Sequence, residues 1–161
     1  MLDTVTVPTG YSANLLVAWG DPIVAGGAAF AADASQDAAA QMKQYGMHTD
    51  GMHFFPMQGL GGKPLSDRGI LCANNEYTHE EVLFTDGQVG AGYTLAKTRK
   101  SQAAHGVSVA ELRRVGGQWQ VVKNSPFGRR TSVFAAPEIF TNDSDSEASA
   151  AASSLCGIVT L

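Results

Sequence analysis

The sequence contains little of what marks the specialised classes of protein. Cysteine occurs twice among 161 residues, as Cys72 and Cys156, and the two fit no CxxC metal or redox spacing. A disulfide between them stays open as an alternative that nothing in the sequence supports. Only 16% of the residues are charged, the formal net charge is −4, and no block of Lys and Arg is present to neutralise phosphates. We therefore expect no nucleic-acid partner.

Long apolar runs are also absent. No stretch approaches the roughly 20 residues that cross a membrane, so we expect no membrane partner. The chain opens with MLDTVTVP instead of a basic segment followed by an apolar one, so this stretch does not read as a secretory signal peptide. An exported protein that has lost its signal peptide has the same appearance, and the location stays open on these grounds.

Short apolar segments separated by turn residues run through the chain. The 18 glycines indicate many tight turns. Residues 11–19 (YSANLLVAW) have the composition of a strand, and Gly116-Gly117 between the apolar residues 107–112 and 118–122 predicts a hairpin. A chain of 161 residues is long enough for one domain with a genuine core. We therefore predict a single, mainly β domain.

One short helix is predicted near residues 36–45. Ser35 is a suitable N-cap, and Gly46 stands where a C′ glycine belongs. No second helix is predicted, because residues 85–104 read as a polar, glycine-containing connection. Residues 141–154 (TNDSDSEASAAASS) are low in complexity and predict a flexible loop.

Regularly spaced short strands favour an all-β assembly, of which a β-propeller is one kind. Propeller blades have four strands and roughly 40 residues each. A chain of this length holds about three or four blades, too few for a well-closed ring. On this interpretation the chain is a piece of a larger protein.

The stretch from Arg68 to Thr78 (RGILCANNEYT) carries the most chemistry. A short apolar run typical of a buried strand leads directly into two asparagines and Glu76, and residues 82–84 are expected to pair with that strand. One reading is an Asx-type turn in which Cys72 is a small buried hydrophobe. The other is a site, because the oxygen and sulfur donors are of the kind that bind a metal or an anionic substrate.

Two further positions have the chemistry of a site. The double arginine Arg129-Arg130, at the start of a predicted strand over residues 129–134, presents guanidinium groups that match phosphate oxygens. His105 precedes a glycine where a strand begins, and it suits either a proton donor, a metal ligand or a structural cap. Each of these signals is weak when taken alone.

The order of several segments resembles the PhoX family of alkaline phosphatases. The segments are DTVTVPTGY, WGDP, AAAQMKQYG with FFPM, RGILCANNEYT, AHGVSVAEL and RRT, which together cover about residues 3–134. RGILCANNEYT is the most specific of them. The resemblance implies a secreted or periplasmic β-propeller enzyme that uses Fe³⁺ and Ca²⁺ to hydrolyse phosphomonoesters.

The resemblance also implies roles for four residues. Cys72 matches the family's iron-ligating thiolate, and Glu76 falls in its Asn-His-Glu-Tyr-Thr motif beside the metal centre. Asn75 stands where that motif has His, which is a departure from the pattern. His105 and Arg130 match family positions for which we expect catalytic roles. Clustered cations would neutralise the phosphate oxygens and lower the charge cost of the transition state.

We expect residues 1–161 to be the N-terminal portion of such a phosphatase domain, because further metal-binding carboxylates of the family would lie beyond Leu161. The expected substrates are small phosphomonoesters, and the expected state is a monomer. The alternative is a non-catalytic, β-rich binding or structural module derived from the same scaffold. The departure at Asn75 and the missing carboxylates favour that alternative.

Overall fold

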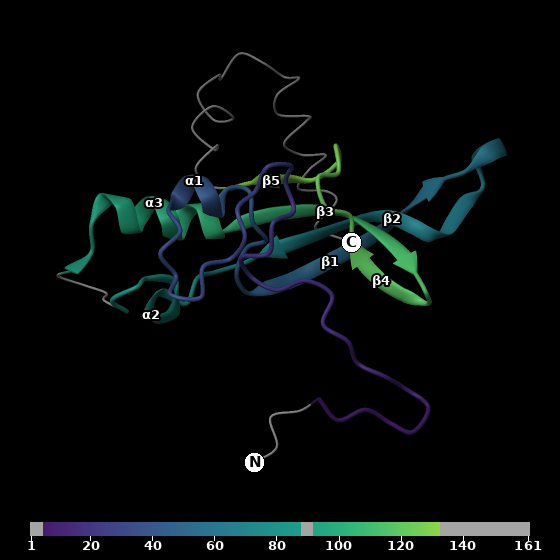
Figure 1. Cartoon of the computed structure of the whole chain (residues 1–161), viewed down its shortest axis with the longest axis horizontal. Coiled ribbons are helices and arrows are strands. Elements are labelled where there is room, and N and C mark those ends of the chain that lie inside the picture. Colours follow the sequence, from purple (N-terminus) through teal and green to yellow (C-terminus); the bar gives the residue numbers. More distant parts are fainter. Residues whose placement is uncertain (1–4, 88–91, 133–161) are drawn as a thin grey trace.

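The computed structural model describes residues 5–87 and 92–132, and within them an antiparallel sheet is the main feature (Figure 1). This confirms the prediction of a mainly β chain. The sheet is open, and whether it belongs to a propeller stays a prediction. Its strands are β1 (Thr49–Gln58), β2 (Pro64–Asn75), β3 (Gly106–Val115), β4 (Gln118–Val121) and β5 (Arg129–Thr131).

Neighbouring strands follow the order β1-β2-β3, and two short strands share the other edge of β3. β5 pairs with residues 107–109 of β3, and β4 pairs with residues 112–115. The turn between β3 and β4 is Gly116-Gly117, and both glycines have positive φ, the backbone that a two-residue hairpin turn requires. The predicted hairpin is therefore confirmed.

The two faces of the sheet differ in how well they are covered. Residues 69, 71, 73 and 75 of β2 are buried, whereas the residues between them are half-buried, as expected because successive side chains point to opposite faces. On the covered face, Ala73 and Ala110 pack against Ile23 and Tyr45 from the N-terminal part of the chain. A second core cluster contains Met47, Leu83, Phe84 and Ala104.

The prediction of a single short helix was wrong, because the described residues form more than one helix. The helix near residues 36–45 is α1 (Ala38–Gln41), but α2 (Glu80–Leu83) and α3 (Leu95–Ala104) also form, together with the 3₁₀ turn η1 (Leu60–Gly62). α3 lies within the stretch that was expected to be an irregular connection. Its sequence LAKTRKSQAA shows no apolar stripe. The residues that it buries are small, apart from Lys100, whose side chain ends in a charged group.

Other local expectations are also corrected. Residues 11–19 form no strand; Tyr11 and Leu15 are exposed there. Residues 82–84 do not pair with β2, since most of that segment belongs to α2. The N-cap of α1 is Asp37, whose side chain accepts from the Ala40 N–H, instead of Ser35.

The helices gather at the end of the sheet where β2 ends and β3 begins (Figure 1). The α1 and α3 helices contact each other there. No helix among residues 5–87 and 92–132 is long and apolar enough to cross a membrane. The loop predicted for residues 141–154 lies outside the described residues.

Candidate functional site

The candidate site is the end of β2, where the RGILCANNEYT stretch turns from apolar to polar. β2 contributes Cys72 to one face of the sheet and Asn75 to the other, because their positions differ by an odd number of residues. The four residues predicted for the site thus fall into two groups. Arg130 and His105 lie together near Asn75, and Cys72 and Glu76 are not part of that group.

Arg130 lies at the centre of a buried polar network. It stands opposite Ser108 in the pairing of β5 with β3. Its Nη1 donates to Asn75 Oδ1 at 2.5 Å and to Ser108 Oγ at 2.6 Å, and Ser108 Oγ also lies 2.5 Å from Asn75 Oδ1. The network joins β2, β3 and β5 on the covered face.

The second nitrogen of the guanidinium group holds the end of α3. Arg130 Nη2 donates to the carbonyl oxygens of Ala103 and His105, at 2.7 and 2.8 Å. Carbonyl groups at the end of a helix have no partner within the helix and carry a partial negative charge. Arg130 satisfies two of them with a positive charge. Burial lowers its pKa to about 10, so the group stays charged at neutral pH.

Position 46 requires a glycine because this network leaves no room for a side chain, and not because a helix ends there. A Cβ atom built on Gly46 would lie 2.5 Å from Arg130 Nη1, from Asn75 Cγ and from the Ala104 carbonyl oxygen. The Gly46 N–H donates to Ser108 Oγ at 3.3 Å. The expectation of a C′ glycine for α1 was therefore wrong, because that helix already ends at Gln41.

His105 is the C-cap residue of α3. Its ring Nδ1 lies 2.9 Å from the Ser101 carbonyl oxygen, one turn back along the helix, and its own carbonyl oxygen accepts from Arg130. These contacts are those of a structural cap, one of the alternatives left open by the sequence. A catalytic role for His105 stays a prediction.

Cys72 lies on the partly covered face of the sheet. In the strand pairing it stands between His53 of β1 and Val109 of β3. The thiol is half-buried, and burial raises its pKa, although the positive charge of Arg129 acts in the opposite direction. Arg129 is opposite Val109 and is exposed, so it shares this face with Cys72. Cys156, with which a disulfide was left open as an unsupported alternative, lies outside the described residues.

Glu76 directly follows β2 and has an exposed side chain, while its backbone N–H donates to the carbonyl of His48 at 3.0 Å. Four strand positions, the separation of Glu76 from Cys72, span about 13 Å. The two residues provide a soft and a hard donor, which suit iron and calcium respectively. In the described part of the chain, no three or more His, Cys, Asp or Glu side chains are grouped closely enough to hold a metal ion. The described residues therefore do not form a metal centre by themselves.

Sequence reasoning missed a buried carboxylate on β3. Glu111 is 2% exposed, and its carboxylate accepts from Arg68 Nε at 2.6 Å and from Ser125 Oγ at 2.5 Å. Burial raises its pKa, but the two donors outweigh burial and hold the pKa below the usual range. An acidic residue within the otherwise apolar stretch of residues 109–112 was the available signal.

Comparison with known proteins places the chain in a family. The family model described as "Alkaline phosphatase PhoX" matches residues 1–153. The chain belongs to the PhoX alkaline phosphatase family, which confirms the resemblance read from the sequence.

A solved structure shows the same relationship. The chain is similar to Pseudomonas fluorescens PhoX, whose structure was determined in complex with vanadate, a transition state analogue. The two share 38% sequence identity with a TM-score of 0.73, over 81% of this chain and 21% of the other. This chain thus spans about a fifth of the length of that relative. No match was found among the curated proteins.

Proposed function

We propose that this chain forms part of a PhoX-type phosphomonoester hydrolase, which releases inorganic phosphate from small phosphate esters. The family match over residues 1–153 is the observation that carries this proposal. The vanadate complex of the relative supports it, since vanadate there is named as a transition state analogue. Because the chain covers only 21% of that relative, we expect the complete site to include residues from elsewhere in the protein.

Within that site, Cys72 and Glu76 are the residues that would hold metal. We propose Fe³⁺ for the thiolate of Cys72 and Fe³⁺ or Ca²⁺ for the carboxylate of Glu76, in line with the preferences of soft and hard donors. When bound, the metals would supply positive charge that stabilises the phosphoryl group in the transition state. Cys72 is half-buried and lies between two paired strands, which fixes the direction of its side chain.

Arg130 is proposed to act in the reaction through position, and a catalytic role of His105 stays a prediction. Arg130 has donors engaged by Asn75, Ser108 and the end of α3. The guanidinium group therefore fixes the end of β2, and with it the start of the segment that carries Glu76. On this proposal, loss of Arg130 lowers kcat because that segment is misplaced. The KM for the substrate is expected to stay unchanged.

The metal proposal is tested by iron content. The whole protein with the substitution Cys72→Ala, purified in the presence of Fe³⁺ and Ca²⁺, is expected to lose bound iron and the hydrolysis of p-nitrophenyl phosphate. Cys156→Ala is the matched control, because it removes the other cysteine. Full iron content in the Cys72→Ala protein would contradict the assignment of Cys72.

A non-catalytic module of the same scaffold is the second candidate. The observation that favours it is the lack of a three-ligand cluster in the described residues. Metal analysis separates the two: bound iron together with calcium supports the enzyme, and a purified protein with neither metal supports the module. Kinship to the family holds in both cases.

We further propose that the open sheet is part of a β-propeller and that the protein works in the periplasm or outside the cell, as a monomer. The antiparallel, open sheet with one partly covered face is compatible with a blade that packs against others. A crystal structure of the whole protein that lacked radially arranged four-stranded sheets would rule out the propeller. Cell fractionation and sedimentation velocity would test the location and the monomer.

A further inference from the structure

A cavity of about 740 Å³ lies between α1, α3 and the residues that follow α2. This volume is typical of sites for small molecules. None of the four residues predicted for the phosphatase site lines it. The residues that line it include Asp37 and Ala38 at the start of α1, Phe84 to Asp86, and five of the first six residues of α3, all but Thr98.

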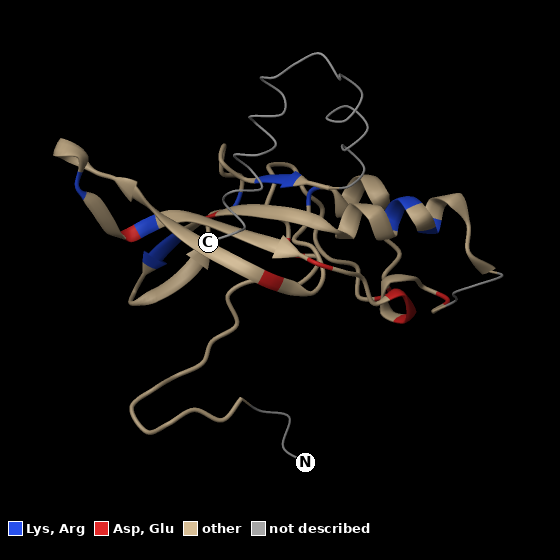
Figure 2. Ribbon diagram, turned by 180° about the vertical axis from the view of Figure 1, so that it is seen from behind, with Lys and Arg blue, Asp and Glu red and all other residues tan. Residues whose placement is uncertain are grey.

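Part of the cavity wall is apolar and part is charged, with three basic side chains and the carboxylates of Asp37 and Asp86. Ala38, Ala39, Phe84, Leu95 and Ala96 supply carbon surface. α3 supplies three cationic side chains and no acidic one in its ten residues, and this concentration of positive charge is visible in Figure 2. The three cations are Lys97, Arg99 and Lys100, and all of them line the cavity.

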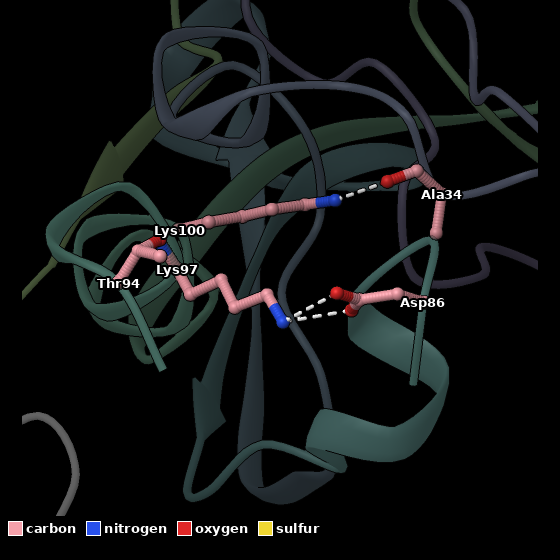
Figure 3. Close-up of polar contacts among 5 residues, drawn as sticks. All are labelled: Ala34, Asp86, Thr94, Lys97 and Lys100. Carbon is pink, nitrogen blue, oxygen red and sulfur yellow. Dashed lines mark hydrogen bonds and ion pairs between the residues drawn. The ribbon is translucent and has the colours of Figure 1, made fainter. Parts of the chain in front are cut away.

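The two lysines extend from α3 across the cavity, Lys100 toward Ala34 and Lys97 toward Asp86 (Figure 3). Lys97 Nζ donates to both carboxylate oxygens of Asp86, at 2.7 and 2.9 Å, and lies 5.1 Å from the centre of the Phe84 ring. Lys100 donates to the carbonyl of Ala34. These contacts hold the lysine side chains in place across the cavity instead of leaving them to extend into solvent.

Lys100 is a buried cation with a neutral partner. It is 6% exposed, and within the described residues it forms no ion pair with a carboxylate. Asp33 and Asp37 act on it only at longer range, and burial lowers its pKa. A buried ammonium group bound only to a carbonyl is costly, and an anion in the cavity would offset that cost.

Gln36 adds a second, independent observation. It lines the cavity and is 9% exposed, and neither its amide nitrogen nor its amide oxygen has a hydrogen-bond partner among the described residues. Buried amides of this kind are uncommon, because each unpaired polar atom has lost its hydrogen bonds to water without a replacement. A ligand with a polar head group in the cavity would offer the missing hydrogen-bond partner.

We propose that this cavity binds a small amphipathic anion, with its acidic head group between Lys100 and Gln36 and its apolar part against Phe84 and the alanines of α1. A cation is disfavoured because the three basic side chains that line the walls outnumber the two carboxylates, those of Asp37 and Asp86. A purely inorganic anion would leave the apolar walls without a contact. The shared chemistry is an acidic head group on a short apolar chain, whether the head group is a carboxylate or a phosphate.

The proposal is tested with three probes of nearly equal size, namely hexanoate, 1-hexanol and hexylammonium, titrated into the ¹⁵N-labelled chain. Hexanoate is expected to shift the backbone amide resonances of residues 34–39 and 95–100 in a saturable manner. Hexanol should bind more weakly, and hexylammonium should leave these resonances in place. Hexyl phosphate in place of hexanoate then separates the two head groups. Equal shifts from hexanoate and hexylammonium would overturn the proposal.

Variants give the second arm of the test. Lys100→Met keeps an unbranched side chain that is one atom shorter and removes its charge, and hexanoate affinity is expected to fall about tenfold. Lys63→Met is the matched control, because Lys63 is exposed near η1, and its affinity should stay within about twofold of the parent. Unchanged affinity in Lys100→Met would contradict the proposal.

Gln36→Leu keeps the proposal testable if Lys100→Met fails to fold. Replacement of the unpaired amide by an apolar group of similar size is expected to leave the urea midpoint of unfolding unchanged or raised, while hexanoate affinity falls. A purely structural role for the cavity predicts no change in affinity, and that result would overturn the role of Gln36 in binding.

Discussion

Within residues 5–87 and 92–132, no carboxylate forms an ion pair with the buried positive charge of Arg130. Among the described residues its partners are an amide oxygen, a hydroxyl and two carbonyl oxygens at the end of α3. The helix dipole supplies about half a negative charge at that end, which compensates in part for the lost hydration of the guanidinium group. The planar fork of arginine allows Nη1 and Nη2 to serve two different elements at once.

At the residue scale we predict that Arg130→Lys destabilises the chain by about 2–3 kcal/mol. Lysine keeps the charge but cannot bind the β2 and α3 partners simultaneously, so some buried oxygens lose their donor. Urea unfolding followed by circular dichroism measures the loss. Arg129→Lys is the matched control on the neighbouring, exposed residue, and its change should stay within about 0.5 kcal/mol. Equal effects of the two substitutions would show that the network contributes little.

At the scale of elements, α3 depends on its ends and its neighbours more than on an amphipathic pattern. Thr94 caps its first turn by accepting from the Lys97 N–H at 3.3 Å, and Arg130 holds its last turn. Between these ends, Lys100, Ser101, Ala103 and Ala104 are buried. A helix of this kind forms because the rest of the fold is present, since isolated helices of ten residues are marginal in water.

We therefore predict that Thr94→Ala costs about 1 kcal/mol, the usual effect of the loss of an N-cap. Amide hydrogen exchange is the most direct measurement, because the loss should speed exchange in residues 95–104 more than in β2. Thr98→Ala serves as the control, since Thr98 lies inside the same helix and alanine has the higher helix propensity. Faster exchange in the Thr98 variant than in the Thr94 variant would contradict the capping role.

At the scale of the whole molecule, the buried Glu111 makes stability depend on pH. Its donors hold the pKa below the usual value of 4.5 in the folded chain, so the unfolded chain binds more protons in acid. The contribution of Glu111 to the free energy of unfolding is complete above about pH 4.5. It is lost as the pH falls through the lower pKa that Glu111 has in the folded state.

The expected result is a smaller acid-induced loss of stability in Glu111→Gln than in the parent chain. The free energy of unfolding, measured in urea between pH 7 and pH 3, should fall less steeply in the variant below pH 4.5. Asp67→Asn, which alters an exposed carboxylate of β2, is the control and should follow the parent. Parallel curves for the parent and Glu111→Gln would contradict the prediction.

Patterns of neighbouring residues in the sequence were enough to predict several features of the fold. The Gly116-Gly117 hairpin, the strand through Cys72 and the mainly β class follow from turn residues and from the alternation of side chains. Each depends on residues within a few positions of one another or on a hydrogen-bonded neighbour. The ordered segments also indicated the family, which the family model confirms.

Tertiary structure alone decided the features that combine distant residues. Arg130 meets Asn75 across 55 positions, and Lys100 meets the Ala34 carbonyl across 66. The second and third helices and the cavity beside α3 depend on such contacts, which no local periodicity records. The physical reason is that burial and charge are satisfied in space, by whichever groups the folded backbone brings together, and not by neighbours along the chain.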